Sequence, residues 1–288
     1  MTPILDTHLH LLYPGRLPYD WTAGIPALAG RTFDHDAYLA AAAGCGVEAN
    51  VFMEATTADP AEHDETEFIA SLAAGPRKRL VGIVAAARPE SDDFERFLDA
   101  LPERVVGLRR VLHVVPDDVS RGPRFREGLR LAAARGLTFD LCVLARQLPL
   151  ALELVEACPE VSFVLDHCGV PDVAAGALDP WRDGIDRLAG HPNVVCKVSG
   201  LPAYCDPRHV SAATVRPYVE HALGAFGWDR VVWGSDWPLV EINSTLAAWV
   251  AISRELVAGE PEANRRKLFH ENAARVYNVT LDAADGSG

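Results

Sequence analysis

The sequence predicts a single (β/α)8 barrel, the TIM-barrel architecture. Eight short runs are rich in β-branched and apolar residues, amphipathic segments lie between them, and polar residues follow most of the runs. Strands that alternate with helices form a parallel sheet, because each helix returns the chain to the same edge. Eight such units are the number that closes into a barrel.

The eight runs follow one another along the chain without a break in the alternation. Each is nearly continuous in apolar residues, which is typical of a parallel sheet that is buried on both faces. We expect strands over residues 4–9, 47–55, 80–86, 105–112, 137–143, 161–167, 193–199 and 230–235.

Start and stop signals mark the helices. Asp34 is placed to cap a helix that Gly44 and Gly46 end, and Asp179-Pro180 has the pattern of an N-cap followed by proline at the first helical position. We expect helices over residues 34–43, 92–101, 124–135, 148–157, from 180 onward, 215–226, 246–257 and 262–277.

The chain of 288 residues fits one large domain, and it contains no linker-like stretch or short repeat. We expect the barrel over residues 1–281 and a small, polar, disordered tail over 282–288. An open, doubly wound sheet is the alternative fold. The chain lacks GxGxxG after the first run, which argues against the dinucleotide-binding version of that sheet.

The composition limits the kinds of partner that the protein is expected to bind. The formal net charge of −13 argues against nucleic acid and anionic membranes. The six cysteines form no CxxC pair, no apolar stretch reaches membrane-spanning length, and the N-terminus does not resemble a signal peptide. We therefore expect a reduced, cytoplasmic protein with a small-molecule substrate, and homo-oligomer formation stays open.

His8 and His10 end the first expected strand. They are two residues apart, so both imidazoles point to the same face, where they could ligate a metal such as zinc. Two loop histidines without a function are the alternative for such a pair. A barrel brings the ends of its strands together, so His167 after the sixth strand and Asp236 after the eighth can converge on the pair.

Asp236 lies in GSDWP, directly after the eighth strand. It is either a general base or a turn and N-cap residue. His167 is either catalytic or a core histidine with satisfied hydrogen bonds. Cys168 has apolar neighbours and is expected to be structural.

Several charged residues lie in or next to apolar runs, and each has two interpretations. Arg109 and Lys197 lie within apolar strands, where each either contacts substrate or pairs with buried carboxylates. Glu54 either ligates metal or pairs with one of these cations. The loop after the first strand could place an aromatic floor under a ligand. The residues expected to contact substrate are Arg109, Lys197, Tyr19, Trp21, Trp237 and His113.

Five motifs together resemble the amidohydrolase-2 family, and FHENAARVY at 269–277 is similar to the closing helix of the same superfamily. The motifs are DTHLH at 6–10, RLPYDW at 16–21, LDHCG at 165–169, CKVSGL at 196–201 and WGSDWP at 233–238. Within the family the chain resembles the sugar-lactonase branch, which includes rhamnono- and fucono-lactonases and is related to dicarboxypyrone and muconolactone hydrolases.

The resemblance implies hydrolysis of a lactone in carbohydrate metabolism. Asp236 would be the general base and could also ligate the metal. His8 and His10 would be metal ligands or polarising groups, and His167 would be the histidine of the sixth strand. Members that bind metal firmly usually have a histidine at the end of strand five, where this chain reads FDLCV, and no bridging lysine or glutamate is evident on strand four. The resemblance therefore implies one weakly held divalent ion, with zinc the first choice, or none.

Two other functions compete with a lactonase. Some family members are metal-dependent decarboxylases of aromatic or unsaturated acids, but they usually need the firmly bound metal that the missing histidine argues against. A non-catalytic binding protein is the other candidate. It would have no reason to keep His8, His10, His167 and Asp236 together.

Overall fold

The computed structural model describes residues 2–55, 61–75 and 79–280. The expected tail over 282–288 lies outside the described residues, as do residues 1, 56–60, 76–78 and 281 of the expected domain. Eight parallel strands pair in sequence order, from β1 beside β2 to β7 beside β8. The strands are β1 (Ile4–Leu9), β2 (Val47–Met53), β3 (Leu80–Ala86), β4 (Val105–Val111), β5 (Thr138–Cys142), β6 (Phe163–Leu165), β7 (Val194–Val198) and β8 (Val231–Trp233).

The barrel closes where the chain leaves β8 and meets the end of β1. Leu9 forms a parallel bridge with Trp237, and the amide of Asp236 donates to the carbonyl of His8 at 2.8 Å. The predicted barrel is thus confirmed. All eight predicted strands exist, although the sixth and eighth are shorter than expected because their polar ends turn out of the sheet.

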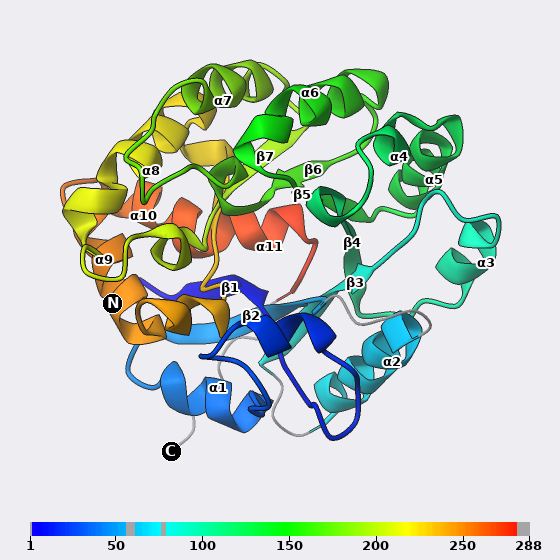
Figure 1. Cartoon of the computed structure of the whole chain (residues 1–288), viewed down its shortest axis with the longest axis horizontal. Coiled ribbons are helices and arrows are strands. Elements are labelled where there is room, and N and C mark those ends of the chain that lie inside the picture. Colours follow the sequence, from blue (N-terminus) through cyan, green and yellow to red (C-terminus); the bar gives the residue numbers. More distant parts are fainter. Residues whose placement is uncertain (1, 56–60, 76–78, 281–288) are drawn as a thin grey trace.

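Helices surround the strands in Figure 1, while the C-terminal segment lies against β1 near the centre of the view. The α-helices are α1 (His35–Ala41), α2 (Ala61–Ala73), α3 (Phe94–Asp99), α4 (Asp118–Arg121), α5 (Pro123–Ala134), α6 (Leu148–Ala157), α7 (Trp181–Ala189), α8 (Ala212–Phe226), α9 (Leu246–Leu256), α10 (Glu262–Arg266) and α11 (Asn272–Val276).

Each predicted helix has a counterpart in the structure, but some caps and boundaries differ from the prediction. Asp34 caps α1 by accepting from the amide of Ala37, as predicted. The cap predicted at Asp179 is wrong, because Pro180 occupies the N-cap position and α7 starts after it. The predicted helix 262–277 is interrupted by a π-turn over Lys267–Glu271, and α2 was missed because its acidic first half hides the apolar stripe.

The interior of the barrel is a small apolar core. Its members come from six strands and from the C-terminal segment, which closes the end opposite the polar strand termini. They are Leu5, Ala49, Val51, Met53, Val84, Val164, Val195, Val232, Ala273 and Tyr277. This plug leaves the carboxyl ends of the strands as the open end of the barrel.

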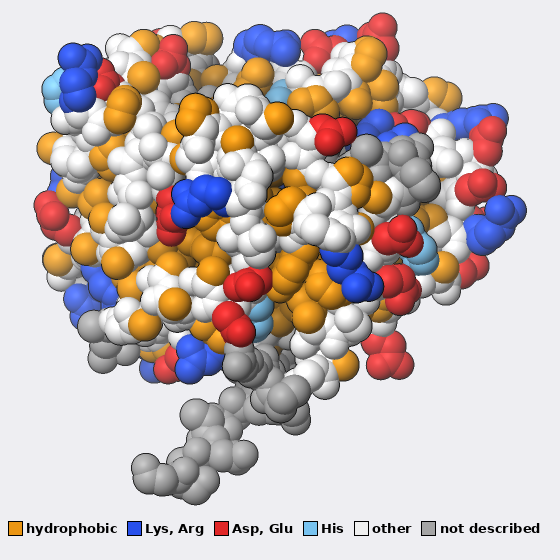
Figure 2. All heavy atoms as spheres, turned by 60° about the horizontal axis from the view of Figure 1, so that its bottom comes forward, with side chains coloured by type: hydrophobic (Ala, Val, Ile, Leu, Met, Phe, Trp, Pro, Cys, Tyr) orange, Lys and Arg blue, Asp and Glu red, His pale blue; other side chains and the backbone are white. Residues whose placement is uncertain are grey.

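The face drawn in Figure 2 carries charged side chains of both signs. In Figure 2, lysine and arginine side chains stand among aspartates and glutamates on the face shown, and they do not form a continuous basic area there. No helix in the part of the chain that the structure describes combines the length and apolar character needed to cross a bilayer. The six cysteines are buried free thiols.

Candidate active site

The polar residues predicted at the strand ends converge at the open end of the barrel. His8 and His10 come from β1 and its end, Arg109 from β4, His167 from the turn after β6, and Asp236 from the segment after β8. All five are at least nine-tenths buried. Four of them, all except His8, line a cavity of about 280 Å³. The prediction that these histidines and Asp236 meet in space is correct.

His8 and His10 face each other through their Nε2 atoms, which are 3.2 Å apart. The Nδ1 atom of His10 lies 3.0 Å from the carbonyl oxygen of Met53, and because that oxygen can only accept, Nδ1 carries the proton. Burial lowers the pKa of His10 to about 3, so the ring is neutral. Its Nε2 therefore presents a lone pair to His8.

The Nε2 of His8 also presents a lone pair. Arg109 Nη1 lies 3.3 Å from it, and a guanidinium can only donate. The proton of His8 is then on Nδ1, 3.4 Å from the carboxylate of Asp166. Lys197 is also 3.4 Å from Nδ1, but its ammonium has shorter contacts to two carboxylates. Burial lowers the pKa of His8 well below its ordinary value.

Arg109 is held by carboxylates rather than free in the cavity. Its Nε donates to Glu54 Oε1 at 2.6 Å and its Nη2 to the Glu54 carbonyl at 2.8 Å, while Nη1 lies 3.4 Å from Asp166. Glu54 thus takes the pairing role that the sequence left open. Its position against a guanidinium does not support the predicted contribution to a metal site.

Lys197 lies beneath the cavity and does not line it. Its Nζ contacts Asp140 at 2.6 Å and Asp166 at 2.9 Å, and all three side chains are fully buried. Tyr277 donates to Asp140 from the C-terminal plug at 2.7 Å. The substrate contact expected of Lys197 is therefore replaced by a buried ion-pair network that supports Asp166 and, through it, His8.

Asp236 has no hydrogen-bond partner for either carboxylate oxygen among the described residues. Its Oδ1 lies 3.7 Å from His8 Nε2 and 3.6 Å from His10 Nε2. Burial outweighs His167 and Arg109 and raises the pKa of Asp236 to about 6.

Two strained turns aim the catalytic candidates into the cavity. Asp236 has φ of 58° and His167 has φ of 54°, both in the left-handed region that non-glycine residues rarely adopt. The ring of His167 is held by the hydroxyl of Ser199, 2.9 Å from Nδ1. Burial lowers the pKa of His167, so this ring is also neutral.

Glycines let the backbone approach these side chains. A Cβ on Gly200 would lie 2.5 Å from His167 Nδ1, and one on Gly234 would lie 2.6 Å from the His8 Cβ. Both positions therefore exclude a side chain. They explain the glycines in the motifs CKVSGL and WGSDWP in physical terms.

The donors fit a single divalent ion. His8, His10 and Asp236 place three candidate ligand atoms within 4.8 Å of one another, as do His8, Asp166 and His167. The first set is better suited, because Asp236 is unpartnered whereas Asp166 is paired with Lys197 and Arg109. Two neutral imidazoles and one carboxylate are a ligand set that zinc accepts.

Of the other residues expected to contact substrate, Trp21 and His113 line the cavity, while Tyr19 and Trp237 do not. Trp237 is buried against Phe33 and Tyr38 and donates to Glu241. Tyr19 is buried in the core. In both cases the aromatic ring packs under the loops. An aromatic motif in the sequence does not distinguish such packing from contact with a ligand.

Two contributors were missed by the sequence analysis. Tyr204 lines the cavity beside His167, and a tyrosine four residues after the CKVSG turn was its only signal. Asp6 joins β1 to the segment after β8, because it accepts from the Ser235 amide at 2.7 Å. It also accepts from the Tyr38 hydroxyl at 2.8 Å. It is the first residue of the motif DTHLH.

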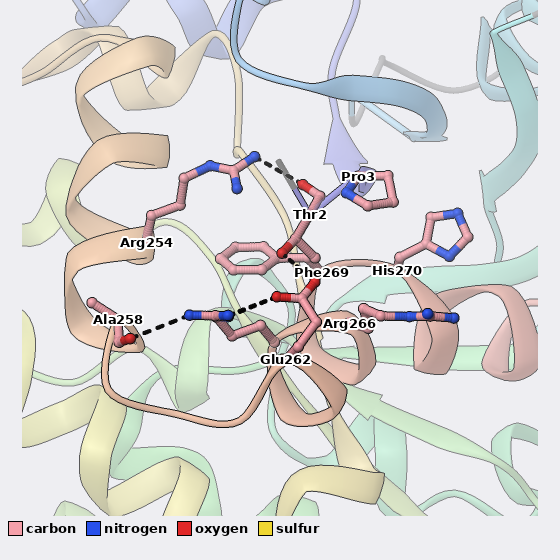
Figure 3. Close-up of a pocket in the computed structure, with 9 residues that line it drawn as sticks. Thr2, Pro3, Arg254, Ala258, Glu262, Arg266, Phe269 and His270 are labelled. Atoms are coloured by element: carbon pink, nitrogen blue, oxygen red, sulfur yellow. Dashed lines mark hydrogen bonds and ion pairs between the residues drawn. The ribbon is translucent and has the colours of Figure 1, made fainter.

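A larger hollow of about 690 Å³ lies at the opposite end of the barrel, beside the residues that precede β1. Figure 3 shows Arg254 and Glu262 turned toward Thr2, which they bind at 3.0 Å each. These charged groups are engaged with the chain itself. None of the predicted site residues lies there, and this end of a barrel ordinarily serves stability.

Comparison with known proteins agrees with the fold. The sequence model of the amidohydrolase family matches residues 5–279. An uncharacterised protein of Sinorhizobium fredii is 37% identical over 163 residues, covering 56% of this chain and 54% of that protein. An L-fucono-1,5-lactonase of Burkholderia ambifaria is 32% identical over 185 residues, covering 62% of this chain and 63% of that enzyme. The aligned part thus spans between half and two thirds of each relative.

Among solved structures, an amidohydrolase from Burkholderia multivorans with bound zinc superposes with a TM-score of 0.88. It is 26% identical to this chain and covers 96% of it and 100% of its own length. The likeness therefore extends over the whole barrel.

Proposed function

The chain belongs to the amidohydrolase family, and on that premise we propose that it hydrolyses a lactone, with Asp236 as the general base. The observation that carries the proposal is the Asp236 carboxylate, which is buried, lines the cavity and has no hydrogen-bond partner among the described residues. Such a group is costly to bury unless something binds it, and a water molecule between it and a substrate carbonyl would do so. The lactonase named among the relatives supports this choice of ester.

Asp236 would accept a proton from water as the water oxygen attacks the lactone carbonyl. With a pKa raised to about 6 by burial, the carboxylate is mostly ionised near neutral pH and is a stronger base than an exposed aspartate. When the ring C–O bond breaks, the protonated Asp236 would return its proton to the departing alkoxide. Water and lactone are thereby converted to a hydroxy acid with no other reactant.

The negative charge that develops on the carbonyl oxygen needs donors already in place. Arg109 is fixed by Glu54 and lines the cavity, so its guanidinium is preorganised for that charge. One such donor contributes on the order of 3 kcal/mol to transition-state stabilisation. His8, His10 and Asp236 would hold zinc, which when bound supplies Lewis-acid polarisation of a carbonyl and acidifies water.

The decisive experiment is hydrolysis of a lactone panel by the wild type and by Asp236→Asn. We expect turnover of a lactone by the wild type and a loss of about 1,000-fold in kcat in the variant, because a general base contributes on that scale. The sugar lactones of the named relatives and pyrone or muconolactone dicarboxylates belong in the panel. Each assay is run with and without chelator.

Asp183→Asn is the matched control, since Asp183 is exposed on α7 and does not line the cavity. It should keep the wild-type rate. An Asp236→Asn enzyme that turns over near the wild-type rate would refute the assignment of the base. Carbon dioxide release from an aromatic or unsaturated acid, with every lactone left intact, would favour the decarboxylase instead.

A further inference from the structure

The cavity has a polar floor and an apolar wall. His10, Arg109, His167 and Asp236 form the floor described above. The described residues of the wall come from the ends of β4 and β5 and from the loops after β6 and β8. Its apolar side chains include Val111, Val114, Cys142, Leu144, Val170 and Leu239.

Val114 shows how apolar the entrance is. Its side chain is 63% exposed, and it is the one large hydrophobic side chain so exposed in the part of the chain that is described. An exposed apolar residue at the rim of a binding cavity is kept at a cost in solubility. Cys142 lines the same cavity, and burial raises the pKa of its thiol to about 12, so this sulfur is neutral and adds to the apolar surface.

The polar groups of the wall are few and partly engaged. Trp21 donates its indole N–H to the Ala55 carbonyl at 2.7 Å, so it offers only the ring to a ligand. His113 has its Nδ1 3.7 Å from the Cys142 sulfur. Among the described lining residues, the Tyr204 hydroxyl and the other nitrogen of His113 remain for hydrogen bonds to a substrate.

We infer that the lactone carries a short apolar substituent, alkyl or alkenyl, and few hydroxyl groups. This inference rests on the proposed lactonase function and names its substrate class. With the ester carbonyl at the floor, a substituent on the ring points to the wall formed by Val111, Val114 and Leu144. Apolar atoms there replace water on both surfaces, which favours binding.

A polyhydroxylated ring fits the same space poorly. A sugar lactone carries a hydroxyl on most ring carbons, and each one turned to the wall would lose its water without gaining a partner. Cavity size limits the substrate to one ring with a short substituent. At about 280 Å³ the cavity is at the small end of ligand sites, so one ring and a chain of a few carbons fill it.

The first test compares δ-octanolactone with L-fucono-1,5-lactone, which present the same six-membered ester ring. We expect kcat/KM to be higher for the alkyl lactone by about tenfold or more, since a few methylenes in an apolar pocket discriminate on that scale. Equal or faster hydrolysis of the sugar lactone would overturn the inference while leaving the lactonase proposal intact. Failure to hydrolyse any lactone would overturn both.

The second test places the substituent on the wall. In Leu144→Ser, the ratio of kcat/KM for δ-octanolactone to that for unsubstituted δ-valerolactone should fall by about tenfold, because only the first substrate loses an apolar contact. Leu223→Ser is the matched control, since Leu223 is half-buried on α8 and does not line the cavity. A ratio that is unchanged in Leu144→Ser, or lowered equally in the control, would contradict this placement of the chain.

Discussion

His8 and His10 direct unprotonated nitrogens at each other across 3.2 Å. The remaining nitrogen of each ring faces a group that only accepts, the carbonyl of Met53 for His10 and the carboxylate of Asp166 for His8. Two opposed lone pairs repel unless a cation lies between or beside them. Arg109 supplies part of that charge to His8, and a divalent ion would supply it to both rings.

We predict that the protein binds one zinc or cobalt ion and that His10→Gln weakens the binding by at least about tenfold, because a ligand is lost while Asp236 and His8 remain. Calorimetric titration gives the affinity, and the visible spectrum of the cobalt form reports the ligand set. His63→Gln changes an exposed histidine on α2 and serves as the control. Equal affinities in the two variants would exclude His10 as a ligand.

The raised pKa of Asp236 predicts the acid limb of the pH profile. Burial stabilises the protonated carboxyl, and only the ionised form can accept a proton from water, so kcat/KM should fall as pH decreases through about 6. Added zinc should move this limb to lower pH, because a dication favours the carboxylate. Profiles measured at low and saturating zinc test both statements. A profile that stays flat from about pH 5 to 7 would speak against Asp236 as the titrating base.

Asp6 is predicted to position the site rather than to react. Its carboxylate accepts from the amides of His8 and Ser235 and from the Tyr38 hydroxyl, so it joins β1 to the turn that carries Asp236. Asp6→Asn retains one acceptor oxygen and should lose about 2 kcal/mol of stability, together with a clear fall in kcat.

Tyr38→Phe removes only the outer hydrogen bond of Asp6 and should leave kcat closer to the wild type. Thermal unfolding and steady-state kinetics measure the two effects separately. If Asp6→Asn were destabilised and yet kept its full kcat, the residue would serve the fold without positioning the site.

Glu65 is predicted to make the stability of the fold depend on pH, although it takes no part in the proposed reaction. Burial, with a smaller contribution from Glu54, raises the pKa of Glu65 from its ordinary 4.5 to about 8. Between these values the unfolded chain has lost the proton that the folded chain keeps. The stabilising contribution is therefore complete below 4.5 and is lost as pH rises through 8.

Glu65→Gln keeps an acceptor for the Ala55 amide and carries no charge to desolvate. We expect it to flatten the pH dependence and to raise stability near pH 8 and above by about 2 kcal/mol. Chemical denaturation at several pH values measures this. Parallel curves for the variant and the wild type would show that Glu65 is not the titrating group.

The sequence by itself determined the order of the strands and the convergence of His8, His10, His167 and Asp236. Both follow from local information: hydrophobic runs mark strands, and parallel strands in a barrel bring their carboxyl ends together. Asp34 could be identified as a cap for the same reason, because its partner lies three residues away.

Only the tertiary structure decided how the buried charges pair and what the cavity wall is made of. Glu54 and Arg109 are 55 residues apart in the sequence, and Lys197 and Asp140 are 57 apart. A local sequence pattern therefore cannot predict either pairing. The pKa of Asp236 depends on how completely the barrel excludes water, and the rings of Tyr19 and Trp237 turned into the core instead of the cavity. Such outcomes depend on packing between distant segments, which no single stretch of the chain encodes.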